Sequence, residues 1–265
     1  MQPRISIAVQ AEENKSYGNK MIYEEYFERI YGRLLHVFPL LESRVPQPQL
    51  VKMRGGECYR YIEKQLDQAI IAKTARLISA LRSAILLNAA GLTLDVGTMK
   101  RVIDEIDADI MFLAGPLMGM EKTNRHDDFI REFFQEEFDH EEPLKSSQKR
   151  ARVPRDKIRA YNARSYSASN MNESDAIRMM ELIEKAYSGF VHGASVHIME
   201  IYGGHPDSER FFVEGVLGTS RQKSSETDLA NYFERALHAV ILAAKALNAD
   251  DVFEDLYESS HKVRL

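Results

Sequence analysis

Apolar side chains recur every three or four residues through long segments of the chain, a spacing that places them on one face of an α-helix. The segments are 20–41, 58–90, 95–115, 173–202 and 225–247. Helices with one apolar face bury that face against one another. We therefore predict an all-α fold, a helical bundle built on four long helices plus shorter connecting helices.

Residues with special backbone preferences indicate where the predicted helices end. Gly91 follows the 58–90 segment at the position where a glycine commonly closes a helix. At 1.5 Å per residue this helix would be roughly 45–50 Å long. Asp95 or Thr98 is the expected N-cap of the next helix, and Gly203 is the expected end of the helix that covers 173–202.

Composition shifts suggest how the chain is divided. Residues 1–19 are mostly polar, and we interpret them as an N-terminal arm with a short edge strand at Ile5–Val9. Residues 20–265 are predicted to form a single α-helical domain. Within it an acidic run is followed directly by a basic run, with prolines that interrupt any helix. We expect an exposed, charged connection near 140–154.

The overall composition narrows the class of protein. Hydrophobic residues make up 44% and charged residues 28% of the 265 residues, as in ordinary globular proteins. Cys58 is the only cysteine, so an intrachain disulfide is excluded and a reducing, cytoplasmic location is expected. No stretch approaches the ~20 apolar residues of a membrane span. The net charge of −5 argues against a protein that coats nucleic acid without specificity.

Metal and cofactor motifs are weak in this sequence. His192 and His197 are five residues apart, which on a continuous helix turns their rings about 140° away from each other. Two Glu-x-x-His pairs, ending at His140 and His261, have the spacing of bundle metal sites but lie near predicted helix ends. No glycine-rich phosphate loop is present. We predict neither a metal nor a cofactor.

A stripe of small residues marks the predicted helix that covers 173–202. Gly189, Gly193 and His197 are spaced four apart, so on a continuous helix they share one face. Each glycine inside a helix costs about 1 kcal/mol relative to alanine. Glycine at these positions would be explained if another helix, a ligand or a second copy of the chain approached this face closely. His197 and Glu200, three apart, also share a face.

The heptapeptide YSGFVHG at residues 187–193 follows YNARSYSASN and the earlier helical segment ARLISALRSAILLNAAGL. Together they resemble bacterial all-helical proteins of unknown function that are grouped with HEPN-like bundles. The matching positions are Arg82, Arg101, Glu105, Tyr187, Val191, His192 and Gly193. The resemblance implies a HEPN-type bundle, and some such bundles are ribonucleases.

The nuclease pattern implied by that resemblance is an arginine, a polar residue, several further residues and then a histidine. Arg125 and His126 are adjacent, and Arg235 and His238 are only three residues apart. Neither pair has the required spacing, so the resemblance does not carry the nuclease activity over to this chain.

The basic run contains a second group of candidate residues. Those for binding nucleic acid or another anion are Lys149, Arg150, Arg152, Arg155, Arg159, Tyr161 and Arg164. Basic side chains bind phosphates and aromatic rings stack on bases, so the combination is typical of nucleic-acid contacts. The alternative is a solvated linker that the preceding acidic run partly neutralises.

The sequence favours a protein that acts by binding, with RNA or another nucleic acid, a nucleotide or a protein as the partner. The competing hypothesis is a divergent HEPN-like nuclease or nucleotide-modifying enzyme. In it, His192 or His197 would work with Arg82 and Glu105 in a cleft between helices. A third hypothesis is a dimerising scaffold, a homodimer that packs through the glycine face.

Overall fold

The computed structural model describes residues 5–53, 56–138, 140, 142–147, 149–150, 152–165 and 172–262. Among these, side chains are described from residue 23 onward, apart from 143, 261 and 262. Helices dominate the described chain, and each of its two sheets has two strands, so the predicted all-α fold is confirmed. In chain order the elements are α1 (Ile5–Glu42), β1 (Gln49–Met53), β2 (Gly56–Arg60), α2 (Leu66–Ala89), α3 (Thr93–Leu117), α4 (Asn124–Phe133), η1 (Pro143–Lys145), α5 (Arg155–Ala163), α6 (Glu173–Val191), α7 (Ser195–Ile198), η3 (Met199–Ile201), β3 (Tyr202–Gly203), β4 (Arg210–Phe211), α8 (Ser220–Ala246) and α9 (Asp250–Lys262).

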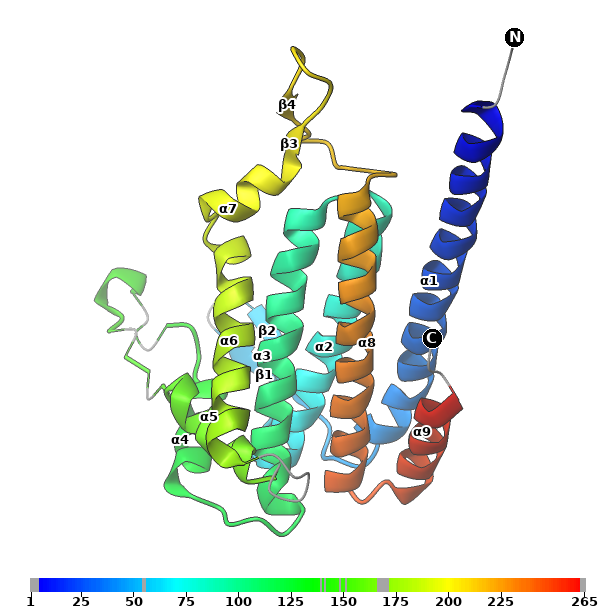
Figure 1. Cartoon of the computed structure of the whole chain (residues 1–265). Helices are drawn as coiled ribbons and strands as arrows, with labels where there is room; N and C mark the ends of the chain where they lie inside the picture. Colours follow the sequence, from blue (N-terminus) through cyan, green and yellow to red (C-terminus); the bar gives the residue numbers. More distant parts are fainter. Residues whose placement is uncertain are drawn as a thin grey trace.

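Helix α3 is the element around which the bundle is arranged (Figure 1). Helices α2, α5, α6 and α8 all pack against it, and α1 packs against α2 and α8. The core formed by these helices contains side chains that are at most 1% exposed. They include Phe27, Leu34, Leu77, Leu81, Ile103, Ile110, Phe112, Phe233 and Val240. Burying one such side chain stabilises a protein by about 1.5–3 kcal/mol, so these apolar faces drive the helices together.

Helices α1, α2, α3 and α8 contain 38, 24, 25 and 27 residues, and α6 contains 19. Helix α6 is thus a fifth long helix, only a little shorter than the others. The prediction of exactly four long helices is therefore not confirmed. No helix in the described part of the chain is long and apolar enough to cross a membrane.

Helix α1 runs without a break past residue 19, where the sequence suggested the end of a polar arm. The edge strand expected at Ile5–Val9 is wrong, because these residues form the first turns of α1. Gln, Ala and two Glu, which favour helix, follow at residues 10–13, and no described strand is adjacent in the chain to pair with Ile5–Val9. Residues 1–4 lie outside the described part.

Strands β1 and β2 form an antiparallel hairpin in which Val51 pairs with Cys58. The helix predicted from residue 58 therefore begins only at Leu66, and its 24 residues correspond to about 36 Å. Gly56 has a φ of +146°, a backbone conformation that no helix contains and that glycine adopts without strain.

The C-terminal end of α2 is closed by the two bonds of a Schellman motif. The Gly91 N–H donates to the Asn88 carbonyl at 2.9 Å, and the Leu92 N–H donates to the Leu87 carbonyl at 3.0 Å. Gly91 has a φ of +71°, so its predicted role as the closing residue is confirmed. Helix α3 begins directly afterwards at Thr93, ahead of both predicted N-cap residues.

The single helix predicted over residues 173–202 is wrong. Helix α6 ends at Val191, and Gly193 follows with a φ of +62°. The Ala194 N–H then donates to the Gly189 carbonyl at 2.8 Å, which satisfies the last turn of α6. Gly193 is thus a helix-closing glycine rather than an interior one, and the short helix α7 starts a new direction.

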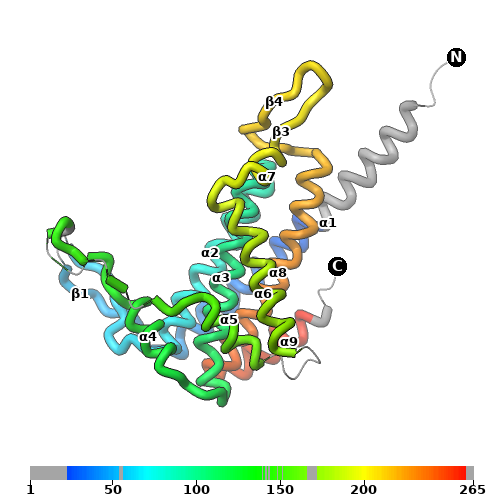
Figure 2. The backbone as a smooth tube through the Cα atoms, turned by 60° about the vertical axis from the view of Figure 1, so that its left-hand side comes forward, coloured from blue at the N-terminus to red at the C-terminus, as the bar shows by residue number. Residues whose placement is uncertain are grey.

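Two further elements complete the fold. The β3–β4 hairpin pairs Tyr202 with Phe211 and projects beyond the ends of α3 and α8 (Figure 2). Helix α9 packs on α8, with Val252 and Leu256 buried. Between α4 and α5 most described residues are exposed, and Leu144 is fully so, whereas Val153 is buried.

Helix α3 contains a glycine, Gly97, because the ring of Phe190 from α6 lies directly on it. A Cβ atom at this position would stand 2.4 Å from Cδ1 of Phe190. Real atoms do not approach so closely, so the ring would have to move. Gly97 therefore fixes how closely α6 approaches α3.

A pair of glycine substitutions tests this contact. Gly32 is also inside a helix, but a Cβ there would meet nothing within 4 Å. We expect Gly32→Ala to stabilise the protein by about 0.5–1 kcal/mol and Gly97→Ala to destabilise it by about 1–3 kcal/mol through overpacking. Urea denaturation measures both values. Equal stabilisation by the two substitutions would show that Phe190 does not lie on Gly97.

Candidate functional site

Helix α6 is joined to the bundle mainly by polar and aromatic contacts. Among its described residues only Ala176 is buried, whereas α2, α3 and α8 each bury eleven or more. The apolar residues of α6 that the sequence predicted to be buried, such as Ile177 and Ile183, are only half-buried. Other interactions must therefore hold this helix in place.

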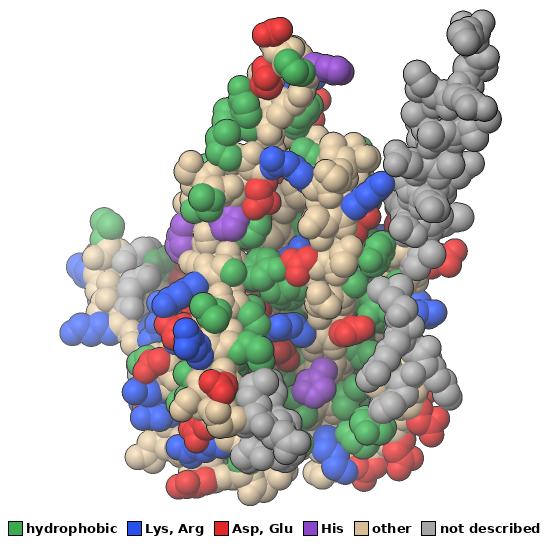
Figure 3. Space-filling view, in the orientation of Figure 1, with side chains coloured by type: hydrophobic (Ala, Val, Ile, Leu, Met, Phe, Trp, Pro, Cys, Tyr) green, Lys and Arg blue, Asp and Glu red, His purple; other side chains and the backbone are tan. Residues whose placement is uncertain are grey.

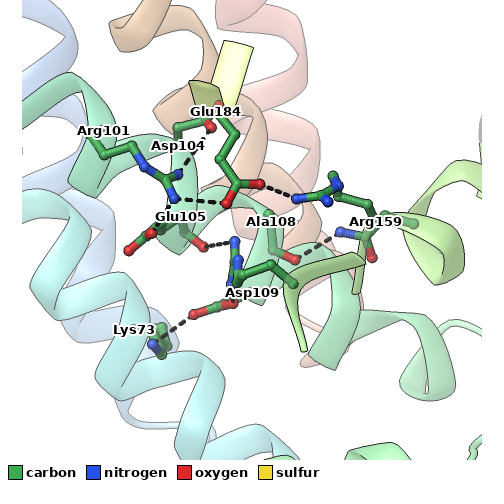
Figure 4. A network of polar contacts seen from close by, with 10 residues as sticks. Lys73, Arg101, Asp104, Glu105, Ala108, Asp109, Arg159 and Glu184 are labelled. Carbon is green, nitrogen blue, oxygen red and sulfur yellow. Dashed lines mark hydrogen bonds and ion pairs between the residues drawn. The ribbon is translucent and has the colours of Figure 1, made fainter. Parts of the chain in front are cut away.

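Glu184 is the main polar attachment point of α6 (Figure 4). It accepts a hydrogen bond at 3.0 Å from Arg101 of α3 and another from Arg159 of α5. Arg101 also contacts Glu105 at 2.5 Å and Asp104 at 3.8 Å. The side chains of Arg101, Arg159 and Glu184 are 11%, 15% and 21% exposed. Removing one member of such a partly buried network leaves the others without a counter-charge, which is costly.

A second branch of the network fixes α5 to α2 and α3. Asp109 is 7% exposed and accepts from Lys73 at 2.7 Å and from Arg155 at 2.5 Å. Asn162 donates from Nδ2 to the Ala108 carbonyl at 2.9 Å. Most charged side chains of α3 that face α2, α5 or α6 therefore have an oppositely charged partner.

Helices α6 and α8 both pack on α3 and leave a groove between them whose floor is α3 (Figure 1). Charged and apolar side chains alternate along this face of the molecule (Figure 3). The groove has two chambers that share Tyr187, Asp228 and Asn231 as lining residues. We call them the upper chamber, toward α7, and the lower chamber.

The upper chamber has a volume of about 860 Å³. Its lining includes Gly97, Lys100, Phe190, His197, Glu200 and Ser225. The Lys100 side chain is 4% exposed, and its ammonium group donates to Asp228 at 2.9 Å and to the Ser225 carbonyl at 3.1 Å. Burial lowers the pKa of Lys100, and the Asp228 carboxylate opposes this shift. Lys100 thus ties α3 to the first turns of α8.

The lower chamber has a volume of about 530 Å³. Its lining includes Asp107, Met180, Ile183, Tyr232, Arg235 and His238. Arg235 donates to Asp104 at 2.8 Å, and its guanidinium group lies 5.3 Å from the centre of the Tyr232 ring. The Tyr187 hydroxyl donates to Asp228, and its ring meets the Tyr232 ring edge-on. Both chambers fall in the size range of small-molecule sites.

Asp107 differs from the other carboxylates of the groove. Its Oδ1 atom is covered by neighbouring atoms and has no hydrogen-bond partner among the described residues. Burial, with a smaller contribution from the Asp104 carboxylate, raises the pKa of Asp107 to about 7. Buried polar atoms normally have partners, and unpaired carboxylates of raised pKa are concentrated at functional sites.

The four predicted catalytic residues do not form one cleft. His197 lines the upper chamber, and Glu105 lines a separate cavity beside Lys73 and Arg155. Arg82 is exposed on α2 and pairs with a glutamate of α1 at 2.9 Å, and His192 is exposed at the end of α6. Among the described residues no contact joins them.

The predicted glycine stripe is also wrong, because α6 breaks at Gly193. A Cβ on Gly189 would stand 2.4 Å from Cδ2 of His197, so the ring of His197 itself lies on Gly189. His197 and Glu200, which the sequence placed on one face, contact each other, with Nδ1 and Oε1 3.2 Å apart. The close approach that Gly189 permits is thus internal to the chain.

Part of the basic segment faces inward rather than toward a partner. Arg155 pairs with Asp109, Arg159 pairs with Glu184, and Tyr161 is 4% exposed and donates to the Glu121 carbonyl at 3.0 Å. These three side chains are committed to the fold. Their internal partners count against a nucleic-acid surface at these three positions.

The other basic candidates are exposed. Arg152 lies 3.4 Å from Glu132, in agreement with the alternative in which the acidic run neutralises the basic one. Lys149, Arg150 and Arg164 are exposed, and Arg164 lies 6.0 Å from the centre of the Tyr161 ring. Exposed charges of this kind interact weakly and are screened by salt.

Sequence reasoning did not identify the residues that line the groove floor. Lys100, Asp104 and Asp107 are spaced four and three residues apart, so they form a charged stripe on one face of the helix. That stripe is the feature of the sequence from which the groove floor could have been predicted. A charged stripe on a helix that neighbours bury on several sides indicates either an internal ion pair or a site.

Arg29 and His36, which lie seven residues apart on α1, have a spacing close to that of the nuclease pattern. The apolar Ile30 follows Arg29, where that pattern requires a polar residue.

No family model, curated protein or solved structure matches the chain. The resemblance to HEPN-like bundles therefore stays a prediction.

Within the described residues no group of three or more His, Cys, Asp or Glu side chains is placed to hold a metal ion. The Glu-x-x-His pair ending at His140 lies in the exposed α4–α5 connection. The side chain of His261 lies outside the described part.

The raised pKa of Asp107 leads to a pH-dependent stability. The pKa of Asp107 in the unfolded chain is near 3.8. Between about pH 4 and 7 the folded protein therefore keeps a proton on Asp107 that the unfolded chain has lost. As pH rises through this interval, the free energy of unfolding of the wild type should fall. It should stop falling above the pKa of Asp107 in the folded protein.

Asp107→Asn removes this titration. We expect the variant to gain stability relative to wild type as pH rises from 5 to 7, with a constant difference above pH 8. Urea denaturation at each pH measures it, with Asp95→Asn, an exposed aspartate on the same helix, as the control. A difference that does not change with pH would show that Asp107 is ionised and paired throughout.

Proposed function

We propose that the protein binds a small organic molecule, of nucleotide size or smaller, in the groove between α6 and α8. The observation that carries this proposal is the covered carboxylate oxygen of Asp107, unpaired among the described residues, at a chamber of about 530 Å³. Small-molecule sites combine apolar walls with a few placed polar groups, and this groove has both.

The way in which α6 is attached supports binding in this groove. A helix that buries only Ala176 and is fixed by Glu184 leaves room along its length, where Met180, Ile183 and Tyr187 face the chambers. A tightly packed helix pair would have filled this space with apolar side chains. The groove is therefore a built feature of the bundle.

The other hypotheses have less support. The nuclease hypothesis needs His192 or His197 near Arg82 or Glu105, and these residues lie at different places in the fold. The scaffold hypothesis needs an open glycine face, and His197 covers Gly189. The nucleic-acid hypothesis loses Arg155, Arg159 and Tyr161 to internal contacts.

Blocking the groove tests the proposal. Asn231 is exposed and lines both chambers, so Asn231→Trp would place a large ring in the space that they share. Lys223→Trp adds the same ring to an exposed position of α8 outside the groove and is the matched control. A panel of nucleotides, amino acids and primary amines is screened by thermal shift, and binding is then measured by calorimetry.

We expect at least one compound of the panel to bind wild type and to bind Asn231→Trp at least tenfold more weakly, a loss of about 1.4 kcal/mol. Affinity for Lys223→Trp should stay within about twofold of wild type, because exposed surface substitutions usually change little. The absence of any bound compound, or equal affinity in the two tryptophan variants, would contradict binding in the groove.

A further inference from the structure

We propose that the lower chamber binds the protonated amine of a small organic molecule, with Asp107 as the counter-ion of that amine. This inference rests on the proposed function, because it names the chemistry of the molecule that occupies the groove. Three features of the lower chamber support it.

The first feature is that Asp107 stands out among the chamber carboxylates. Asp228 accepts from Lys100 and Tyr187, and Glu234 accepts from Tyr26 at 3.4 Å. The covered Oδ1 atom of Asp107 accepts from none of the described residues. A carboxylate accepts hydrogen bonds and an ammonium group only donates them, so the two are complementary.

The second feature is the charge of the chamber. Three carboxylates line it, those of Asp107, Asp228 and Glu234, against the single guanidinium group of Arg235. Arg235 is held by Asp104 at 2.8 Å, which adds a further negative charge beside the chamber. A cleft lined mainly by one sign of charge concentrates small ions of the opposite sign. The chamber therefore selects cations over anions such as phosphate.

The third feature is the shape and polarity of the walls. Met180 and Ile183 from α6 offer apolar surface for a hydrocarbon chain or ring. The half-buried Tyr187 ring meets the Tyr232 ring edge-on, and the faces of tyrosine rings attract ammonium groups. His238 and Asn231 add polar groups, for which no hydrogen bond is found among the described residues. An organic amine matches these walls better than a bare metal ion, which needs several oxygen ligands at once.

The probes that test the inference are 1,4-diaminobutane, 1,6-diaminohexane and 2-phenylethylamine. Each is paired with the neutral alcohol of the same carbon skeleton. Binding is measured by calorimetry to wild type, to Asp107→Asn and to Glu234→Gln. The last variant removes a chamber carboxylate that already has a partner. Mg²⁺ is tested in parallel as the simplest divalent cation.

We expect at least one amine to bind wild type, its alcohol to bind at least tenfold more weakly, and Asp107→Asn to lose tenfold or more of the affinity for the amine. Glu234→Gln should lose less than threefold.

Affinity for the amine should also rise from pH 6 to pH 8, because binding requires the ionised form of Asp107. The other titratable and charged groups that face Asp107 or its chamber are Asp104 of α3, Tyr187 of α6, and Asp228, Tyr232, Glu234, Arg235 and His238 of α8. Burial lowers the pKa of His238, and we expect His238→Gln to keep the rise.

Three results would overturn the inference: no binding of any amine, equal affinity for amine and alcohol, or equal affinity of wild type and Asp107→Asn for the amine. Mg²⁺ binding that disappears in Asp107→Asn would overturn it in favour of a metal site. If amines fail while a nucleotide or amino acid still binds wild type and not Asn231→Trp, the groove proposal stands and only the amine is excluded. If no compound depends on Asn231, both proposals fail.

Discussion

The ion pairs of Glu184 are the interaction on which the candidate site depends. Helix α6 buries too little apolar surface to be held by the hydrophobic effect alone, since Ala176 is its one buried residue among those described. Arg101 from α3 and Arg159 from α5 meet at Glu184 and fix the middle of the helix. Phe190 on Gly97 fixes its end. Polar attachment at a few points, in place of continuous apolar packing, leaves a groove along the helix.

The position of α3 explains why the groove contains buried charges. Neighbouring helices cover α3 on several sides, so several of its charged residues are removed from water. Burial of a charge is tolerated when it is paired. Asp109, Asp104 and Lys100 have partners on other helices. Asp107 lines the lower chamber between α6 and α8, where no described residue pairs with its covered oxygen. The same arrangement thus accounts for the stability of the bundle and for the unsatisfied carboxylate.

Much of the fold could be predicted from the sequence, because the apolar repeats of Leu77, Ile103 and Val240 lie on faces that are completely buried. Two of the elements that were wrong follow from glycine. Gly193 closes a helix that periodicity alone continues, and Gly56 belongs to a hairpin. Little of the candidate site could be predicted. The partners of Arg155, Arg159 and Tyr161 are distant in sequence, and the polar stripe of α3 becomes informative only when its neighbours are known.

The most direct test of this account is hydrogen exchange of α6, measured by mass spectrometry in Glu184→Gln and in Glu181→Gln. Glu181 is one turn away on the same helix and pairs with the exposed Lys185 of α6 itself, so it is the matched control. If Glu184 holds α6, amides of 173–191 should exchange faster in Glu184→Gln, while α2 and α8 keep wild-type protection. Unchanged exchange of α6 in that variant, or equal acceleration throughout the bundle, would contradict the account.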